Sequence, residues 1–306
     1  MSESALQREL RALLGAGVVF DAPLSRYTSL RVGGPVEALA TPTSRRELAD
    51  LLALCRRRGW PHLVVGAGFN LLVRDAGLEG VAVKLSHFRA LETRPGPRVA
   101  AEAGVTHASL TRLCTREGLS GLEFGAGIPG TIGGWIAMNA GIGTREVKDV
   151  VESVELQVPG EDAPRTLAVG DLQFHYRELR GAPPGAVLVG AVFRVEASTP
   201  PAVRAEVDAL LARRAATQPL DVPSCGSVFK NPSGDFAGRL IEAAGLKGER
   251  VGGAQISDVH ANFIVNRGGA TAADVLGLIE RARERVARAT GIELETEVRI
   301  VGRNGA

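Results

Sequence analysis

The chain has 306 residues, of which 45% are hydrophobic and 23% charged, and its formal net charge is +2. This balance excludes wholesale disorder and gives no reason to expect a nucleic-acid partner, and the length predicts about two domains. The three cysteines, Cys55, Cys114 and Cys225, are far apart and odd in number, which suits a reducing compartment. The N-terminus is polar, and no apolar run reaches the roughly 18 residues of a membrane span. We therefore expect a cytoplasmic protein that binds neither nucleic acid nor membrane.

Hydrophobic periodicity and capping signals predict the elements of the first half. Helices are predicted at residues 4–14, 44–58 and 106–117, the second behind the capping box Ser44-Arg-Arg-Glu47. Strands are predicted at residues 36–40, 62–65, 81–85, 90–93 and 98–103. The strand at 62–65, which we expect to be buried, leads into the glycine loop Gly66-Ala-Gly68-Phe-Asn70, at a place where α/β folds hold ligands.

The sequence of the second half predicts a hairpin, a domain boundary and a second domain with different elements. Strands at 151–158 and 165–169 form the hairpin, residues 171–180 are predicted as a short polar turn of helix, and 186–196 as a strand. The segment Ser198-Thr-Pro-Pro201 is a plausible joint, so we expect domains at 1–198 and 199–306. After it the sequence predicts a long helix from Pro201, a loop at 217–235, a helix at 236–244, a strand at 262–266, a helix from Thr271 to Gly291 and a strand at 292–301.

The most unusual stretch runs from Gly125 to Gly143, with seven glycines in nineteen residues and no charged side chain. Clustered glycine brings bare backbone close to a ligand, and a diphosphate is the obvious candidate. The spacing Gly125-x-Gly127-x-x-Gly130 matches a dinucleotide fingerprint, but a predicted helix precedes it instead of a strand. The stretch lacks the lysine of a P-loop. A tight crossing between helix and sheet remains an alternative.

Other candidate residues are ambiguous on the sequence alone. Residues 225–232, Cys-Gly-Ser-Val-Phe-Lys-Asn-Pro, place a hydroxyl, an ammonium and an amide in a predicted loop, where they suit proton donation and phosphate binding or form an ordinary turn. Ser227 lacks a nucleophile-elbow motif. No histidine pairs with other ligands at metal-site spacing, so no metal is expected. Arg177 by default is surface charge, and Glu297 shares an alternating, solvent-facing pattern with Glu293 and Glu295.

Taken together, these stretches closely resemble the UDP-N-acetylenolpyruvoylglucosamine reductase family, flavoenzymes of peptidoglycan precursor synthesis. The matching segments occur in the family's order and spacing, which makes the resemblance specific. They are residues 27–34, 65–70, 127–134, 138–141, 176–177, 225–232, 244–248, 252–257, 260–266 and 297–298.

The resemblance implies an α+β fold, in which an FAD-binding domain of the vanillyl-alcohol-oxidase type is followed by a smaller α+β substrate-binding domain whose final strand returns toward the flavin site. It implies non-covalent FAD, NADPH as hydride donor and UDP-N-acetylglucosamine enolpyruvate as substrate. The implied cofactor-binding residues are Gly66, Ala67, Gly68, Phe69, Asn70, Leu71, Gly127, Ile128, Gly130, Thr131, Gly133, Gly134, Asn139 and Arg177.

The resemblance also gives roles to the ambiguous residues. Ser227 would donate a proton, Arg177 and Glu297 would activate the enolpyruvyl carboxylate, and Lys230 and Asn231 would hold the uridine diphosphate. The chain departs from the family at Phe69, Trp135 and Ile142, and residues 177–186 are too few for a substrate-covering tyrosine loop, which indicates the compact second type of the family. The alternatives are an alcohol or sugar oxidase of the same superfamily and a non-catalytic flavin- or nucleotide-binding module. The oligomeric state is not implied.

Overall fold

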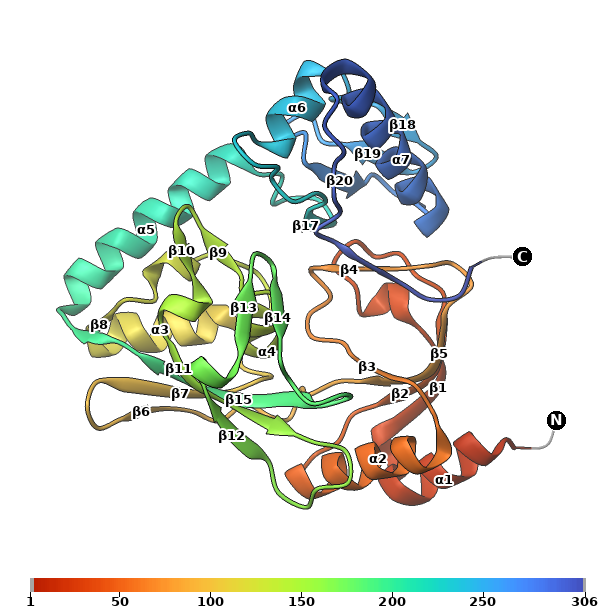
Figure 1. Cartoon of the computed structure of the whole chain (residues 1–306), viewed down its shortest axis with the longest axis vertical. Coiled ribbons are helices and arrows are strands. Elements are labelled where there is room, and N and C mark those ends of the chain that lie inside the picture. The colour runs from red at the N-terminus through yellow and green to blue at the C-terminus, as the bar shows by residue number, and fades with distance from the viewer. Residues whose placement is uncertain (1–2, 305–306) are drawn as a thin grey trace. The chain divides into compact units, whose positions relative to one another are not determined.

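A computed structural model describes residues 3–304 and shows a mixed α and β protein (Figure 1). The described residues divide into two compact units, which we call unit 1 and unit 2. Unit 1 comprises residues 3–20, 38–66 and 80–213, and unit 2 comprises residues 21–37, 67–79 and 214–304. The functional boundary after residue 198 stays a prediction.

The core elements of unit 1 are a four-stranded and a five-stranded sheet, and three two-stranded sheets accompany them in the described residues. Its helices are α1 (Ala5–Leu14), α2 (Arg45–Arg58), α3 (His107–Glu117), α4 (Ile132–Ala137) and most of α5 (Pro200–Thr217). Its strands are β3 (His62–Val64), β6 (Leu91–Arg94), β7 (Arg98–Glu102), β8 (Leu119–Ser120), β9 (Gly141–Ile142), β10 (Arg145–Glu146), β11 (Val151–Gln157), β12 (Arg165–Ala168), β13 (Gln173–His175), β14 (Glu178–Arg180), β15 (Val187–Arg194) and β16 (Glu196–Ala197). Three further strands begin or end in unit 2: β1 (Val18–Pro23), β2 (Pro35–Ala40) and β5 (Leu78–Val83).

Two apolar cores hold unit 1 together. The five-stranded sheet, in the order β12-β11-β15-β7-β6, packs its apolar face with α3 and α4 around Leu110, Ile132 and Phe193. The other sheet, in the order β1-β2-β5-β3, shares a core with α1 and α2 that includes Leu10 and Leu51. Burial of such side chains contributes about 1.5–3 kcal/mol each.

Capping residues set the helix ends much as the sequence predicts. The Thr106 side chain accepts a hydrogen bond from Ser109 N at the start of α3, and Gly118 ends the helix in the left-handed region. Ser44 likewise accepts from Glu47 N at the start of α2. The reciprocal bond of the predicted capping box goes elsewhere, because the Glu47 carboxylate accepts from the N–H and hydroxyl of Thr43 at 2.7 and 2.9 Å.

Residues 171–180 correct the prediction of a helical turn. They contain the hairpin β13–β14, in which Phe174 pairs with Leu179 and the two-residue turn is Tyr176-Arg177. Phe174 and Leu179 are half-buried against the core of the five-stranded sheet, so a cross-strand apolar pair stabilises the hairpin. The polar residues of segment 171–180, considered without the rest of the chain, could not reveal that Phe174 and Leu179 pack against the sheet.

The strand before the first glycine loop is also less buried than predicted. β3 lies at the edge of its sheet, and Val64 is 38% exposed. Burial begins only with Val65, just beyond the strand.

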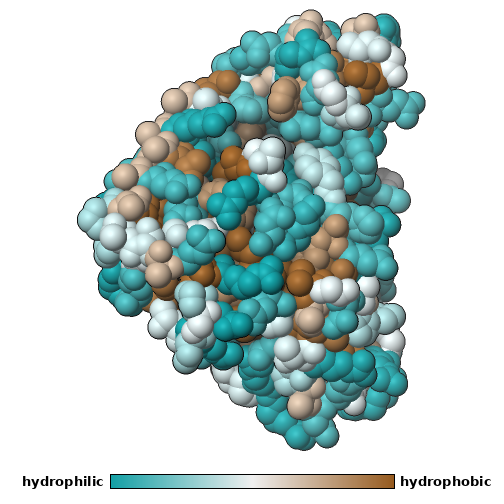
Figure 2. Space-filling view, turned by 60° about the vertical axis from the view of Figure 1, so that its left-hand side comes forward, coloured by the Kyte–Doolittle hydropathy of each residue, from teal (hydrophilic) through white to brown (hydrophobic). Residues whose placement is uncertain are grey.

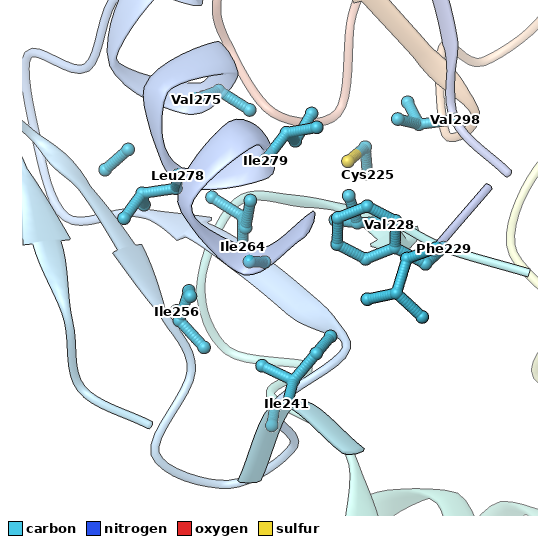
Figure 3. Packing of buried hydrophobic residues seen from close by; sticks show 14 of the residues in the cluster. Cys225, Val228, Phe229, Ile241, Ile256, Ile264, Val275, Leu278, Ile279 and Val298 are labelled. Carbon is cyan, nitrogen blue, oxygen red and sulfur yellow. The ribbon is translucent and has the colours of Figure 1, made fainter. Parts of the chain in front are cut away.

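Unit 2 is a small α+β unit. Its helices are α6 (Ala237–Ala243) and α7 (Ala272–Thr290), and its strands are β4 (Leu71–Val73), β17 (Ser224–Ser227), β18 (Arg250–Val251), β19 (Ala254–Ile256), β20 (Phe263–Asn266) and β21 (Arg299–Val301). The antiparallel sheet β17-β20-β19-β18 buries one face against α6 and α7, with Ile264 and Leu278 in the shared core (Figure 3). β21 pairs with β4 in parallel.

Two predictions for unit 2 are wrong in extent. The predicted loop at 217–235 contains β17, and the predicted strand at 292–301 is a strand only over Arg299–Val301. Residues 295–298 instead run beside residues 228–230, where Lys230 N donates to Glu295 O and Glu297 N to Val228 O, both at 2.8 Å. Alternation alone could not distinguish this irregular pairing from a continuous strand.

An aspartate distant in sequence supports the start of α7. The Asp75 carboxylate accepts from the N–H groups of Ala272 and Ala273 at 2.8 and 2.9 Å, beside the capping box of Thr271 and Asp274. These are first-turn donors that have no partner within the helix itself.

We predict that Asp75→Ala lowers the stability of the protein by about 1–2 kcal/mol, because two helix donors lose a charged acceptor. The measurement is the thermal unfolding midpoint, with Asp162→Ala, in the exposed connection between β11 and β12, as the matched control. An unchanged midpoint for Asp75→Ala would show that Asp75 does not stabilise α7.

Candidate active site

The glycine-rich segment 125–143 serves two purposes within unit 1. A Cβ on Gly125 would lie 2.4 Å from the ring of His107, and one on Gly133 would lie 3.1 Å from Ala103 Cβ, so these glycines allow close packing. A Cβ on Gly130 would meet open space and Gly127 is exposed, so the backbone of this turn can be approached from that side. The segment follows α3, the two-residue strand β8 and a 3₁₀ turn, which is not the βαβ context of a dinucleotide fingerprint.

The two glycine loops meet at Gly66 and Thr131. A Cβ on Gly66 would stand 2.9 Å from Thr131 Oγ1, and this threonine begins α4 without using its hydroxyl as a cap. Lys84 Nζ donates to Gly66 O at 2.9 Å, and burial lowers the pKa of this ammonium. Uncovered backbone, a hydroxyl and a nearby cation are the groups that suit a diphosphate, so these residues fit the FAD that the sequence implies.

The rest of the first glycine loop belongs to unit 2. Gly68 has a φ of +71°, and a Cβ there would lie 2.3 Å from Tyr27 O, so only glycine fits this turn. Asn70 is held on both sides, because its Nδ2 donates to Glu297 O at 3.1 Å and its carbonyl accepts from Arg299 N at 3.2 Å. Phe69, the departure from the family pattern, is 37% exposed.

A bulge in β17 gives Ser227 its orientation. Ser224 pairs with Val265 and Ser227 with Phe263, so β17 carries one residue more than its partner between these two points. Gly226 takes a φ of +75° there, as the left-handed glycine of such bulges does. In a regular strand Ser227 would face the same way as the buried Cys225, whereas the extra residue reverses the alternation.

The residues on both sides of Ser227 are anchored in the core of unit 2. Cys225 and Val228 are 2% and 1% exposed, and Figure 3 shows both side chains among the core residues. Burial raises the pKa of the Cys225 thiol to about 12, so this thiol stays neutral. Ser227 itself is half-buried, in a strand whose residues Cys225 and Val228 are anchored in the core.

Ser227 and Glu297 are connected through a single carbonyl. Val228 O accepts the N–H groups of Glu297 and Val298 at 2.8 and 3.2 Å. The Asn262 side chain fixes the next residue by donating to Phe229 O and accepting from Phe229 N, at 2.8 and 2.9 Å. Glu297 is half-buried whereas Glu293 and Glu295 are exposed, so burial distinguishes the glutamate that periodicity could not.

The two predicted substrate residues of unit 2 have internal partners. Lys230 forms an ion pair with the exposed carboxylate of Glu295. Asn231 is exposed, and its Oδ1 accepts from Ala237 N at the start of α6 at 3.1 Å. Their roles toward a substrate stay predictions.

Arg177 occupies the turn of the hairpin β13–β14 in unit 1. Its φ of +60° is unusual for a residue with a side chain and costs about 1 kcal/mol or more. Its guanidinium lies over the ring of Tyr176, 4.6 Å from the centroid, and Nη1 lies 3.7 Å from Glu146 Oε1. A strained turn that presents a cation is typical of a functional position.

Asn139 is fully buried and its side chain is engaged within unit 1. Its Nδ2 donates to Glu146 Oε2 and to His175 O at 2.9 and 3.0 Å, and its Oδ1 accepts from Lys148 N at 3.1 Å. The side chain therefore supports the hairpin of Arg177, and the predicted contact of Asn139 with the cofactor stays a prediction.

The family departure at Trp135 is accommodated in the core. Trp135 is 3% exposed and packs edge-on against His107 at 4.4 Å between centroids, with Phe124 and Phe193 nearby. Ile142, the other departure in this segment, is half-buried in β9. Trp135 therefore contributes to packing of the five-stranded sheet.

Two residues with evident supporting roles were missed by sequence reasoning. Ser29 N donates to Gly68 O at 3.2 Å and Ser29 Oγ donates to Ser224 O at 2.6 Å, so this serine connects the glycine loop to β17. Glu146 contacts Arg177, Asn139 and Lys148. Ser29 lies in the segment 27–34, to which no role was assigned, and no motif includes Glu146. Each of the two acts through partners that only the fold brings close.

The surface and the side chains of the described part add two observations. Hydrophilic residues spread over the face seen in Figure 2, with smaller apolar groups between them. Within residues 3–304, no helix is long and apolar enough to cross a membrane, and no group of His, Cys, Asp or Glu side chains is arranged to hold a metal ion.

Comparison with known proteins defines the class of this protein. Residues 36–160 match the family model described as FAD binding domain, and residues 218–301 match that of the UDP-N-acetylenolpyruvoylglucosamine reductase C-terminal domain. The protein is thus a flavin-dependent oxidoreductase of α+β fold, as predicted, with an FAD-binding domain followed by a reductase domain.

Full-length relatives identify the family. The chain is 49% identical to UDP-N-acetylenolpyruvoylglucosamine reductase of Geobacter metallireducens over 97% of this chain and 98% of that protein. It is also 49% identical to the reductase of the same name from Alkalilimnicola ehrlichii, over 92% and 93% of the two chains. The crystal structure of the reductase from Thermus caldophilus matches with a TM-score of 0.79 at 36% identity, over 92% of this chain and 97% of that one. The chain belongs to the UDP-N-acetylenolpyruvoylglucosamine reductase family.

The role of the bulge at Gly226 can be tested by substitution. Gly226→Ala forces a side chain into the left-handed region, which costs about 1 kcal/mol or more, and it favours a regular strand in which Ser227 turns toward the core. We expect a lower unfolding midpoint and reductase activity at least tenfold below the parent.

The matched control is Gly170→Ala, since a Cβ on Gly170 meets open space and its φ lies outside the left-handed region. Equal activity of Gly226→Ala and Gly170→Ala would contradict the role given to the bulge.

Proposed function

We propose that the protein reduces the enolpyruvyl group of UDP-N-acetylglucosamine enolpyruvate to the lactyl ether of UDP-N-acetylmuramate, with NADPH as the source of the hydride. The choice of substrate is supported by the family to which the chain belongs. The observation that carries the chemistry is Ser227, a hydroxyl turned out of the core by a bulge and connected through Val228 O to the backbone of Glu297.

In this proposal FAD is bound without a covalent bond. The residues that would hold FAD are the glycine loops at 66–71 and 127–134, with Thr131 Oγ1 beside Gly66 as a polar group for the diphosphate. FAD bound there supplies the hydride that adds to C3 of the enolpyruvyl group.

Arg177 binds and polarises the substrate carboxylate in this proposal. A guanidinium keeps its charge and offers a planar pair of donors that matches a carboxylate. Because negative charge develops on the carboxylate and C2 as the hydride adds to C3, a fixed cation stabilises the transition state more than the ground state.

Glu297 and Ser227 complete the reaction. Glu297 shares a proton with the carboxylate of the substrate and spreads the developing charge through a hydrogen bond. Ser227 then gives its hydroxyl proton to C2, forming the C–H bond, and the alkoxide recovers a proton from water. A serine is a weak acid, so this step depends on placement, which the rigid strand and its bulge provide.

Ser227→Ala tests the proton donor. We expect NADPH to reduce the bound flavin at the parent rate, because the serine has no part in that step, and we expect turnover of the enolpyruvyl substrate to fall by about 10²–10⁴-fold. Stopped-flow absorbance of the flavin separates the two half-reactions. Ser224→Ala, in the same strand, is the control, and a Ser227→Ala enzyme that turns over like the parent would sink the proposal for this residue.

Cofactor and substrate class are tested with the parent protein. We expect yellow protein that releases FAD on denaturation, loses its colour with NADPH under anaerobic conditions, and recovers it on addition of UDP-N-acetylglucosamine enolpyruvate. Recovery with air alone and none with the enolpyruvyl compound would favour the oxidase alternative. A colourless protein without affinity for FAD would contradict the function as a whole.

A further inference from the structure

We infer that Glu146 is a positioning residue for Arg177, which orients the guanidinium that binds the substrate carboxylate. This inference rests on the proposed function of Arg177. It concerns a residue that no sequence motif identified and that lies outside the glycine loops.

Arg177 needs support because its backbone is strained. The residue sits at the second position of a two-residue turn with a φ of +60°, a conformation that persists only where surrounding contacts stabilise it. A long side chain on such a turn also has many rotamers, and fixing it costs about 2 kcal/mol of side-chain entropy.

The neighbouring hairpin β9–β10 supplies these contacts (Figure 1). Gly141 and Glu146 are cross-strand partners in it, and Arg177 reaches both, with Nη2 3.4 Å from Gly141 O and Nη1 3.7 Å from Glu146 Oε1. A Cβ on Gly141 would lie 2.0 Å from Arg145 O, so the tight pairing that brings the two contacts together requires glycine.

The Glu146 carboxylate is itself held in place. Its Oε2 accepts from Asn139 Nδ2 at 2.9 Å and lies 2.8 Å from Lys148 Nζ, while its backbone N–H donates to Asp149 Oδ2 at 2.8 Å. The side chain is 15% exposed and that of Arg177 is 16% exposed, so solvent screens their attraction less than on an open surface.

Asn139 links Glu146 to the hairpin of Arg177. The same Nδ2 that contacts Glu146 donates to His175 O, in the strand that leads into the turn of Arg177. One buried amide thus fixes both the carboxylate and the backbone of the arginine's hairpin. The separation of 3.7 Å is longer than a hydrogen bond, so Glu146 orients the guanidinium by charge. The Glu146 carboxylate therefore does not take the place of the substrate carboxylate on Arg177.

The test is a double-mutant cycle on the flavin-loaded protein, with Glu146→Gln, Arg177→Ala and the double variant. The first readout is the dissociation constant of UDP-N-acetylglucosamine enolpyruvate, measured by calorimetry with oxidised enzyme, and the second is the rate at which this substrate reoxidises the reduced flavin. We expect Glu146→Gln to weaken binding and slow reoxidation by about tenfold, with the rate of flavin reduction by NADPH unchanged.

The cycle separates positioning from general stability. In the Arg177→Ala background, Glu146→Gln should change either readout less than twofold, because the group that it orients is gone. Glu146→Asp, which keeps the charge, should recover part of the loss. Glu152→Gln, which breaks the Arg98–Glu152 ion pair elsewhere in unit 1, is the matched control and should leave both readouts at the parent level.

Three outcomes overturn the inference. A Glu146→Gln enzyme with parental binding and reoxidation would show that Glu146 is not needed. Equal losses from Glu146→Gln with and without Arg177 would show that it acts independently of Arg177. Parental behaviour of Arg177→Ala would remove the proposed role of Arg177 and with it this inference, a failure that the single arginine variant distinguishes from the other two.

Discussion

The extra residue in β17 is the constraint on which the proposed role of Ser227 depends. A strand must alternate between core and solvent, and Cys225 and Val228 are both committed to the core. Only an inserted residue between them can turn the Ser227 side chain away, and only glycine adopts the backbone conformation of that insertion without strain. The hydroxyl therefore stands on a strand that is anchored in the core by Cys225 and Val228, although the sequence around it is typical of a loop.

Elsewhere in both units, polar side chains also hold the backbone near the candidate site residues. Asn70 holds the segment of Glu297 by two backbone contacts, and Ser29 connects Gly68 to Ser224. In unit 1, Asn139 supports the turn of Arg177. In each case a polar side chain binds the backbone of a residue distant in sequence, near or at a candidate catalytic residue, and so fixes the local geometry. Such preorganisation is what a weak acid like serine requires.

The sequence predicts the regular parts of the fold well, for reasons visible in particular residues. Helices with side-chain caps at Ser44, Thr106 and Thr271 begin where predicted, because a cap is a local interaction. The hairpin β13–β14 was mispredicted because its apolar side chains pack on a sheet formed by distant parts of the chain. The irregular run at 292–298 was mispredicted because it pairs with residues 228–230, which are also distant in sequence. The sequence singles out the glycines of 125–143, but whether each one packs or exposes backbone depends on neighbours such as His107. The roles of Ser227, Arg177 and Glu297 came from the family resemblance. The structure adds that Glu297 N donates to Val228 O and that Asn139 supports the hairpin of Arg177.

The backbone of Arg177 has a consequence for how this protein can be improved. Glycine or asparagine is at ease in the left-handed region, so either residue at position 177 would relieve the strain of the turn and raise the stability of the hairpin. Selection for heat resistance alone would therefore favour loss of the guanidinium to which we assign the substrate carboxylate. With the proposed role of Arg177, stability and activity demand opposite residues at position 177, so directed evolution of the enzyme would have to keep this position fixed.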